Sequence, residues 1–102
     1  MEKMIAGKTV SVNEEGYLTD FSQWDAAVAT AIATELNIEL TPRHFEVLTY
    51  LQEQHKKGVA LSIRKVGQSG VVTIQELYAL FPNGPLKYAT KIAGIPKPAS
   101  CI

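Results

Sequence analysis

The 102-residue chain is long enough for one compact domain and too short for two. Hydrophobic residues make up 46% of it and charged residues 20%, which excludes a disordered chain, and no apolar run approaches the ~20 residues that span a bilayer. Ten Lys and Arg balance ten Asp and Glu, so the basic excess typical of nucleic-acid-binding proteins is missing. The first residues lack the apolar core of a secretory signal, and we expect a cytoplasmic protein without membrane association.

The first predicted element is a β-hairpin over residues 10–20. Residues 9–12 alternate between polar and apolar side chains, as a half-buried strand does. Residues 13–16 read Asn-Glu-Glu-Gly, which is turn chemistry, and residues 17–19 return as the second strand.

Two longer helices are predicted next. Ser22 and Asp25 resemble a capping box, and the apolar side chains that follow at helical spacing form one face. The second helix has Thr41 as its cap and Pro42 in its first turn, and it should end near Gly58. The apolar face of the first helix comprises Trp24, Val28, Ala31, Ile32 and Leu36.

Three short helices are predicted in the second half of the chain. The first covers residues 61–66, and the second follows a capping-box pattern of Thr73 and Glu76. The last covers residues 86–93 and stops at Gly94. Beyond it, Pro96 and Pro98 cannot continue a helix and favour a stiff, extended segment.

Together these patterns predict an α+β fold that is mainly α, with an N-terminal β-hairpin packed on a small helical bundle. Residues 1–94 should form the domain, and residues 95–102, here called the arm, should extend from it. Since few apolar side chains in the arm can anchor it, we expect the arm to be mobile and to add little to stability.

The only cysteine, Cys101, is the penultimate residue. One thiol excludes an internal disulfide and a multi-cysteine metal site, and we expect neither a metal nor a cofactor. A thiol at the end of a stiff arm can enter another protein's site, which suits a carrier that accepts sulfur as a persulfide and passes it to a second thiol. Hydrolysis is disfavoured, because it needs a fixed base beside the nucleophile. An incidental surface thiol is the plain alternative.

Positive charge gathers towards the same end of the chain, because from Asn83 onward there are three lysines and no acidic residue. Nearby cations lower the pKa of a thiol and so favour its reactive thiolate form. Lys97 lies in the arm itself. Lys91 and Arg64 are further candidates for binding the thiolate or a partner, and for Arg64 a plain surface role is equally open.

The tail carries a long and specific sequence motif. Residues 80–85 read LFPNGP, residues 89–98 read ATKIAGIPKP, and Cys101 and Ile102 follow. This motif resembles the C-terminal signature of the DsrC/TusE family. The resemblance extends over nearly the whole chain, at residues 16–18, at the Trp24 helix, and at residues 38–41, 44–47 and 63–64.

The resemblance implies a sulfur relay in which Cys101 bears the sulfur. Family members that serve dissimilatory sulfite reductase carry a second tail cysteine, where this chain has Thr90. An intramolecular disulfide with the penultimate cysteine is therefore unavailable here, and the TusE branch is favoured. The implied partners are a sulfur-donor protein of the TusBCD/DsrEFH type and a downstream acceptor, with a link to 2-thiolation of tRNA. Residues 65–76 are shorter than the family's usual helix and loop there, which leaves the partner's identity open.

Two other classes stay open at this stage. Two helices joined near Gly58 can be read as a helix-turn-helix, so a regulatory or nucleic-acid-binding module of the same fold is the alternative, and gel shifts would separate it from a carrier. His44 and His55 lie ~16 Å apart along one helix, too far for one metal, and surface or capping roles are favoured. We expect a carrier of the sulfurtransferase type rather than an enzyme with its own turnover.

Overall fold

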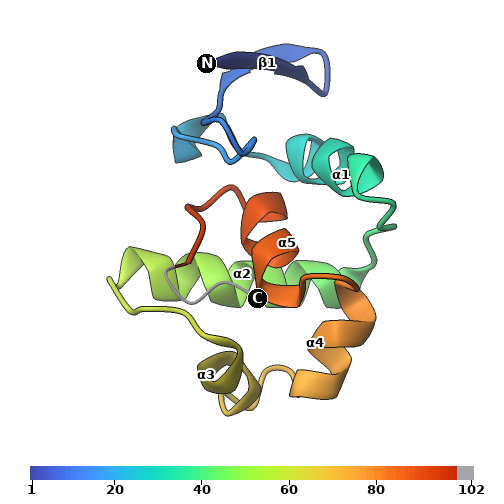
Figure 1. The fold of residues 1–102 in the computed structure, drawn as a ribbon, viewed down its shortest axis with the longest axis vertical. Coiled ribbons are helices and arrows are strands. Elements are labelled where there is room, and N and C mark those ends of the chain that lie inside the picture. The colour runs from blue at the N-terminus through green and yellow to red at the C-terminus, as the bar shows by residue number, and fades with distance from the viewer. Residues whose placement is uncertain (99–102) are drawn as a thin grey trace.

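The computed structural model of the chain describes residues 1–98. Within this part, a two-stranded sheet is followed by five α-helices and one short 3-10 helix (Figure 1). The elements are, in chain order, β1 (Glu2–Ile5), β2 (Lys8–Ser11), η1 (Phe21–Gln23), α1 (Ala26–Glu35), α2 (Pro42–Lys56), α3 (Ile63–Gly67), α4 (Ile74–Leu80) and α5 (Pro85–Ile92).

The N-terminal hairpin forms earlier in the chain than the sequence predicts. Strands β1 and β2 pair antiparallel across a two-residue turn in which Ala6 and Gly7 have φ of 54° and 79°. Positive φ at both positions is the geometry that suits a tight hairpin. The predicted pairing of residues 9–12 with 17–19 shrinks to one bridge, Val12 with Leu18. Asn13 explains this, because its Oδ1 accepts from the N–H of Glu15 and of Tyr17 and closes the turn locally.

Helix α1 starts later than the capping-box pattern indicates. Asp25, and not Ser22, is its N-cap, and the Asp25 carboxylate accepts from the N–H of Val28 at 2.8 Å. Residues 21–23 form the 3-10 turn η1 instead. Trp24 therefore lies before the helix rather than on its apolar face, and the buried side chains of α1 include Ala29 and Ala33, which the predicted stripe omits.

Helices α2 and α4 start as predicted, whereas α3 starts at residue 63 instead of 61 and α5 at residue 85 instead of 86. Thr41 precedes Pro42 at the start of α2, and Thr73 accepts from the N–H of Glu76 at 3.0 Å at the start of α4. His44 has the capping role, because its Nδ1 accepts from the N–H of Thr41 at 3.1 Å. The same ring then donates from Nε2 to the Leu80 carbonyl at 3.0 Å, which ties α2 to the end of α4.

Helix α5 is the central element of the core. It packs against α1, α2 and α4. In Figure 1 the hairpin and α1 lie on one side of it, and α2, α3 and α4 lie on the other. Its buried side chains, Leu86, Ala89 and Ile92, are fully excluded from solvent, and Thr90 satisfies its hydroxyl on the Leu86 carbonyl at 2.8 Å. The predicted α+β fold, mainly α, is confirmed. Of the helices in residues 1–98, none is long and apolar enough to cross a membrane.

Candidate functional site at the root of the C-terminal arm

Cys101, the predicted sulfur-bearing residue, lies outside the described residues. The structure defines the site through what leads to it, namely the end of α5 and residues 95–98. Residues 95–98 form neither helix nor strand, as the two prolines require. The contacts of the first arm residues therefore define where the arm leaves the domain.

The chain leaves α5 through a Schellman motif. Gly94 adopts φ of 74°, its N–H donates to the Lys91 carbonyl at 3.2 Å, and the Ile95 N–H donates to the Thr90 carbonyl at 3.2 Å. This pattern satisfies the last carbonyls of the helix and turns the chain sharply. Glycine fits because a side chain is disfavoured at this φ.

Three side chains hold this exit in place. Trp24 donates from Nε1 to the Ile92 carbonyl at 2.7 Å, and Gln52 donates to the Ala93 carbonyl at 2.8 Å. The Trp24 ring also lies so close to Gly94 that a Cβ there would sit 2.8 Å from the ring Cγ. Ile95 is only 1% exposed and belongs to the core. The expectation that the arm adds little to stability is therefore wrong for its first residue, whereas the boundary at residue 94 stays a prediction.

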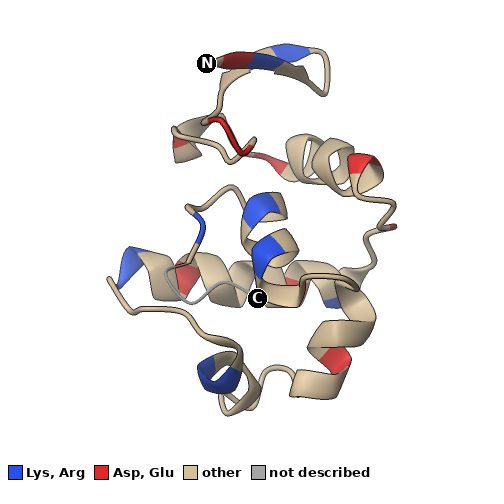
Figure 2. Cartoon of the chain, viewed as in Figure 1, with Lys and Arg blue, Asp and Glu red and all other residues tan. Residues whose placement is uncertain are grey.

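Two of the predicted basic residues, Lys91 and Lys97, come together beside the turn at residues 13–17. Lys97 Nζ donates to Glu15 Oε2 at 2.8 Å. Lys91 Nζ lies 5.9 Å from the centre of the Tyr17 ring, which is a favourable cation–π position. Figure 2 shows two basic bands on α5 and another in the segment that follows it. The arm thus leaves the domain beside a cluster of cations.

The electrostatics of this cluster are visible at Glu15. The Lys97 ammonium, hydrogen-bonded to the Glu15 carboxylate, lowers the pKa of that carboxyl, and the charges of Lys87 and Lys91 act in the same direction. A positive field of this kind also favours the thiolate form of any thiol brought near it. The arrangement can therefore support nucleophilic sulfur chemistry without a metal or a fixed base.

Arg64 is not part of this cluster. It lies on α3, which packs against α4, and its side chain is exposed. Among residues 1–98 the Arg64 side chain has no hydrogen-bond or ion-pair partner. The sequence groups Arg64 with Lys91 and Lys97 as candidate site residues, but in the structure Arg64 lies on α3, whereas Lys91 lies on α5 and Lys97 in the segment after it.

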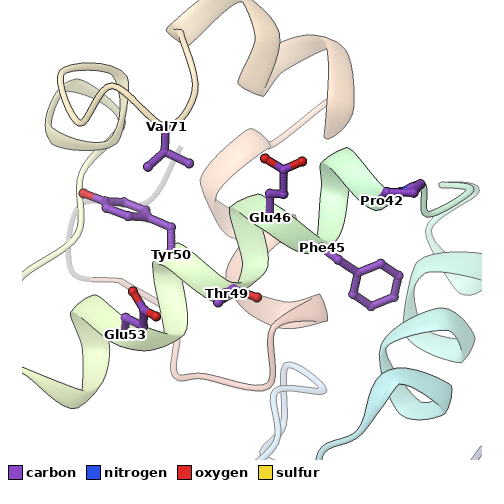
Figure 3. A pocket seen from close by; sticks show the side chains of 7 residues that line it. All are labelled: Pro42, Phe45, Glu46, Thr49, Tyr50, Glu53 and Val71. Carbon is purple, nitrogen blue, oxygen red and sulfur yellow. The ribbon is translucent and has the colours of Figure 1, made fainter.

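The groove on the outer face of α2 does not offer reaction chemistry. It has a volume of about 530 Å³ and is bordered by Phe45, Tyr50 and Val71 together with the carboxylates of Glu46 and Glu53 (Figure 3). None of its lining residues is a thiol or an imidazole. In the described part of the chain, no three His, Cys, Asp or Glu side chains gather to hold a metal ion.

Comparison with known proteins identifies the family. The family model "DsrC like protein" matches residues 4–102. The chain belongs to the DsrC family. This confirms the resemblance seen in the tail motif, and the match extends far beyond the tail.

Individual members of the DsrC family are similar to this chain along nearly its whole length. Sulfurtransferase TusE of Salmonella paratyphi A is 41% identical over 104 residues, covering 94% of this chain and 95% of that protein. Sulfurtransferase TusE of Escherichia coli K12 is 38% identical with the same coverage. The oxidized γ-subunit of the dissimilatory sulfite reductase (DsrC) from Archaeoglobus fulgidus has 36% identity and a TM-score of 0.80, with 100% of both chains covered.

Sequence reasoning missed Glu15 and Tyr17 as members of the site. Glu15 was assigned to a turn, which is correct, but its partner lies 82 residues away. No local pattern predicts such a contact. The tail motif is the informative signal for Lys91 and Lys97. Turn chemistry predicts the turn itself, and only the family resemblance at Gly16-Tyr17-Leu18 hints at its role in the site.

Proposed function

We propose that this protein is a sulfur-relay carrier that receives sulfur as a persulfide on Cys101 and passes it to a second protein. The observation that carries the proposal is the 41% identity to a TusE sulfurtransferase over 94% of the chain. The chain's single thiol lies at the end of the tail motif. The arm leaves the domain at a fixed point close to Lys91, which also supports the proposal.

The chemistry needs only thiolates. The Cys101 thiolate attacks the terminal sulfur of a donor persulfide, forming a sulfur–sulfur bond on Cys101 while the donor's sulfur–sulfur bond breaks and its thiolate leaves. In the second step an acceptor thiolate attacks the outer sulfur on Cys101, and the Cys101 thiolate leaves. No net oxidation or reduction occurs in either exchange.

The basic residues have different roles in this proposal. Lys91 and Lys97 favour the thiolate and the persulfide anion on the arm, since both lie where the arm starts. Arg64 contacts a partner, because its side chain on α3 is exposed. The protein acts as a carrier in stoichiometric amounts, without turnover of its own.

The proposed partners follow from the same relatives. A sulfur donor of the TusBCD/DsrEFH type loads Cys101 in the cytoplasm, and an acceptor uses the sulfur for 2-thiolation of tRNA or a related sulfur-trafficking pathway. A nucleic-acid-binding helix-turn-helix module is not favoured. Its recognition helix would have to be α3, and α3 has only 5 residues.

Intact-mass measurement tests the proposal. The reduced protein, incubated with glutathione persulfide and freed of the reagent, should gain the mass of one sulfur atom. Cys101→Ser should keep the melting curve of the unchanged protein and gain nothing. If the unchanged protein gains no sulfur, or Cys101→Ser gains as much, the carrier proposal is wrong.

A further inference from the structure

The turn at residues 13–17 presents one carboxylate to the arm from a rigid frame. Asn13 Oδ1 accepts from the Glu15 N–H at 2.9 Å and from the Tyr17 N–H at 3.0 Å. The Gly16 N–H donates to the Asn13 carbonyl at 3.0 Å, so the turn is closed by main-chain bonds as well. The backbone that carries Glu15 is thus fixed before its side chain meets Lys97.

The same turn is attached to α5. Tyr17, 1% exposed, donates from its hydroxyl to the Lys87 carbonyl at 3.0 Å. At Gly16 a Cβ would lie 3.1 Å from both Cε and Nζ of Lys91, so the lysine packs directly over the turn. The turn, α5 and the start of the arm therefore form one connected unit.

The Glu15 carboxylate is the negative charge with which the nearby lysines interact. The Glu15 carboxylate is hydrogen-bonded to Lys97 of the arm and interacts electrostatically with Lys87 and Lys91 of α5. Without this carboxylate, like charges on α5 would repel Lys97. Glu14, the neighbouring acid, is exposed and forms no ion pair with residues 1–98.

We propose that Glu15 is a positioning residue for the arm. It holds Lys97 beside α5 through the 2.8 Å ion pair, so that the last residues of the chain start from a defined point on the molecule. Cys101 follows Lys97 by four residues, and its Cα therefore stays within about 14 Å of the Lys97 Cα. The proposal rests on the proposed function, since it gives Glu15 a role in presenting the sulfur-bearing thiol.

The strength of the ion pair suits a reversible contact. The side chains of Lys97 and Glu15 are 36% and 50% exposed, and such pairs shift an equilibrium by roughly 1.5- to 5-fold and are weakened by salt. A partner that receives the arm therefore displaces Glu15 at little cost. When the partner leaves, the Lys97–Glu15 ion pair forms again.

A spin label on Cys101 tests this position, because the label reacts only with that thiol. Paramagnetic broadening of amide signals reports which residues the end of the arm approaches. In the unchanged protein, broadening should concentrate on residues 13–18 and on α5, and it should decline as salt is added. Glu15→Gln should reduce this broadening by roughly 1.5- to 5-fold, and added salt should no longer lower it, because salt then screens only the repulsion between lysines.

Two matched variants make the result specific. Glu14→Gln removes a neighbouring charge and should leave the broadening unchanged, while Glu15→Asp keeps the charge and should retain most of the broadening. Equal broadening in Glu15→Gln and Glu14→Gln, or equal loss in Glu15→Asp and Glu15→Gln, would overturn the positioning role. Sulfur loading is not needed for these spectra, so failure of the carrier function is detected separately by the mass measurement.

Discussion

Residues 92–95 and residues 96–98 are held to the domain by different interactions. In residues 92–95, two carbonyls accept from Trp24 and Gln52, and Ile95 is buried in the core. In residues 96–98, Pro96 and Lys97 are exposed, and Lys97 pairs with Glu15 across the surface. Buried packing with hydrogen bonds is worth several kcal/mol, whereas an exposed ion pair contributes about 0–1 kcal/mol.

This contrast locates the change from domain to arm. The sequence prediction places it between Gly94 and Ile95. Because Ile95 is 1% exposed, we infer that the energetic boundary lies one residue later, between Ile95 and Pro96.

Gly94→Ala should have the largest effect on stability. A Cβ at Gly94 meets the Trp24 ring, and its φ of 74° is unfavourable for alanine. We expect about 1–2 kcal/mol of destabilisation from the backbone and about 1–3 kcal/mol from overpacking, measured by urea unfolding.

Gly58→Ala is the matched control. Gly58 ends α2 with φ of 75°, and a Cβ there has nothing within 4 Å. It should cost only the backbone part, about 1–2 kcal/mol. Equal destabilisation by the two variants would mean that the Trp24 ring does not pack tightly against position 94.

Ile95→Val should have a smaller effect, which separates core from arm. Removing one buried methylene group from a core isoleucine costs about 0.5–1.5 kcal/mol. The same change at Ile74, which is 41% exposed, should cost less in the same urea unfolding experiment. If Ile95→Val proves no more costly than Ile74→Val, then Ile95 belongs energetically to the arm.

The smallest expected effect is on the titration of Glu15. Lys97 lowers the pKa of this carboxyl, with help from Lys91 and Lys87 on α5, so the ion pair is present at neutral pH. It is lost as the pH falls through the lowered pKa, below the usual range near pH 4. In Lys97→Gln the Glu15 midpoint, followed by carboxyl-carbon NMR, should rise towards the usual value. An unchanged midpoint would show that Lys97 does not act on Glu15.

Much of the fold could be predicted because it depends on local sequence patterns. The starts of α2 and α4 follow from Thr41-Pro42 and from Thr73 with Glu76, since a cap and its partner are close in sequence. The stop of α5 at Gly94 is equally local. Strand β1 was missed because its turn, Ala6-Gly7, lacks the Asn-Gly or Asp-Gly signal of a two-residue hairpin.

The site was predictable only in part, because its contacts are long-range. The tail motif pointed to Lys91 and Lys97, but their common neighbour Glu15 is reached only through the fold. Trp24 was expected in the face of a helix, whereas its indole N–H closes the end of α5, 68 residues away. Arg64 is grouped with the lysines by motif, but it lies on α3 rather than on α5 or in the segment that follows it.

The central claim is that the folded domain is complete without the end of the arm and that sulfur is carried only on that end. A chain ending at Pro98 tests both parts in one intact-mass experiment after incubation with glutathione persulfide, beside the full chain. The full chain should gain one sulfur atom. The shortened chain should show the compact charge-state distribution of a folded protein and gain none. Sulfur on the shortened chain, or an unfolded charge-state distribution, would contradict this account.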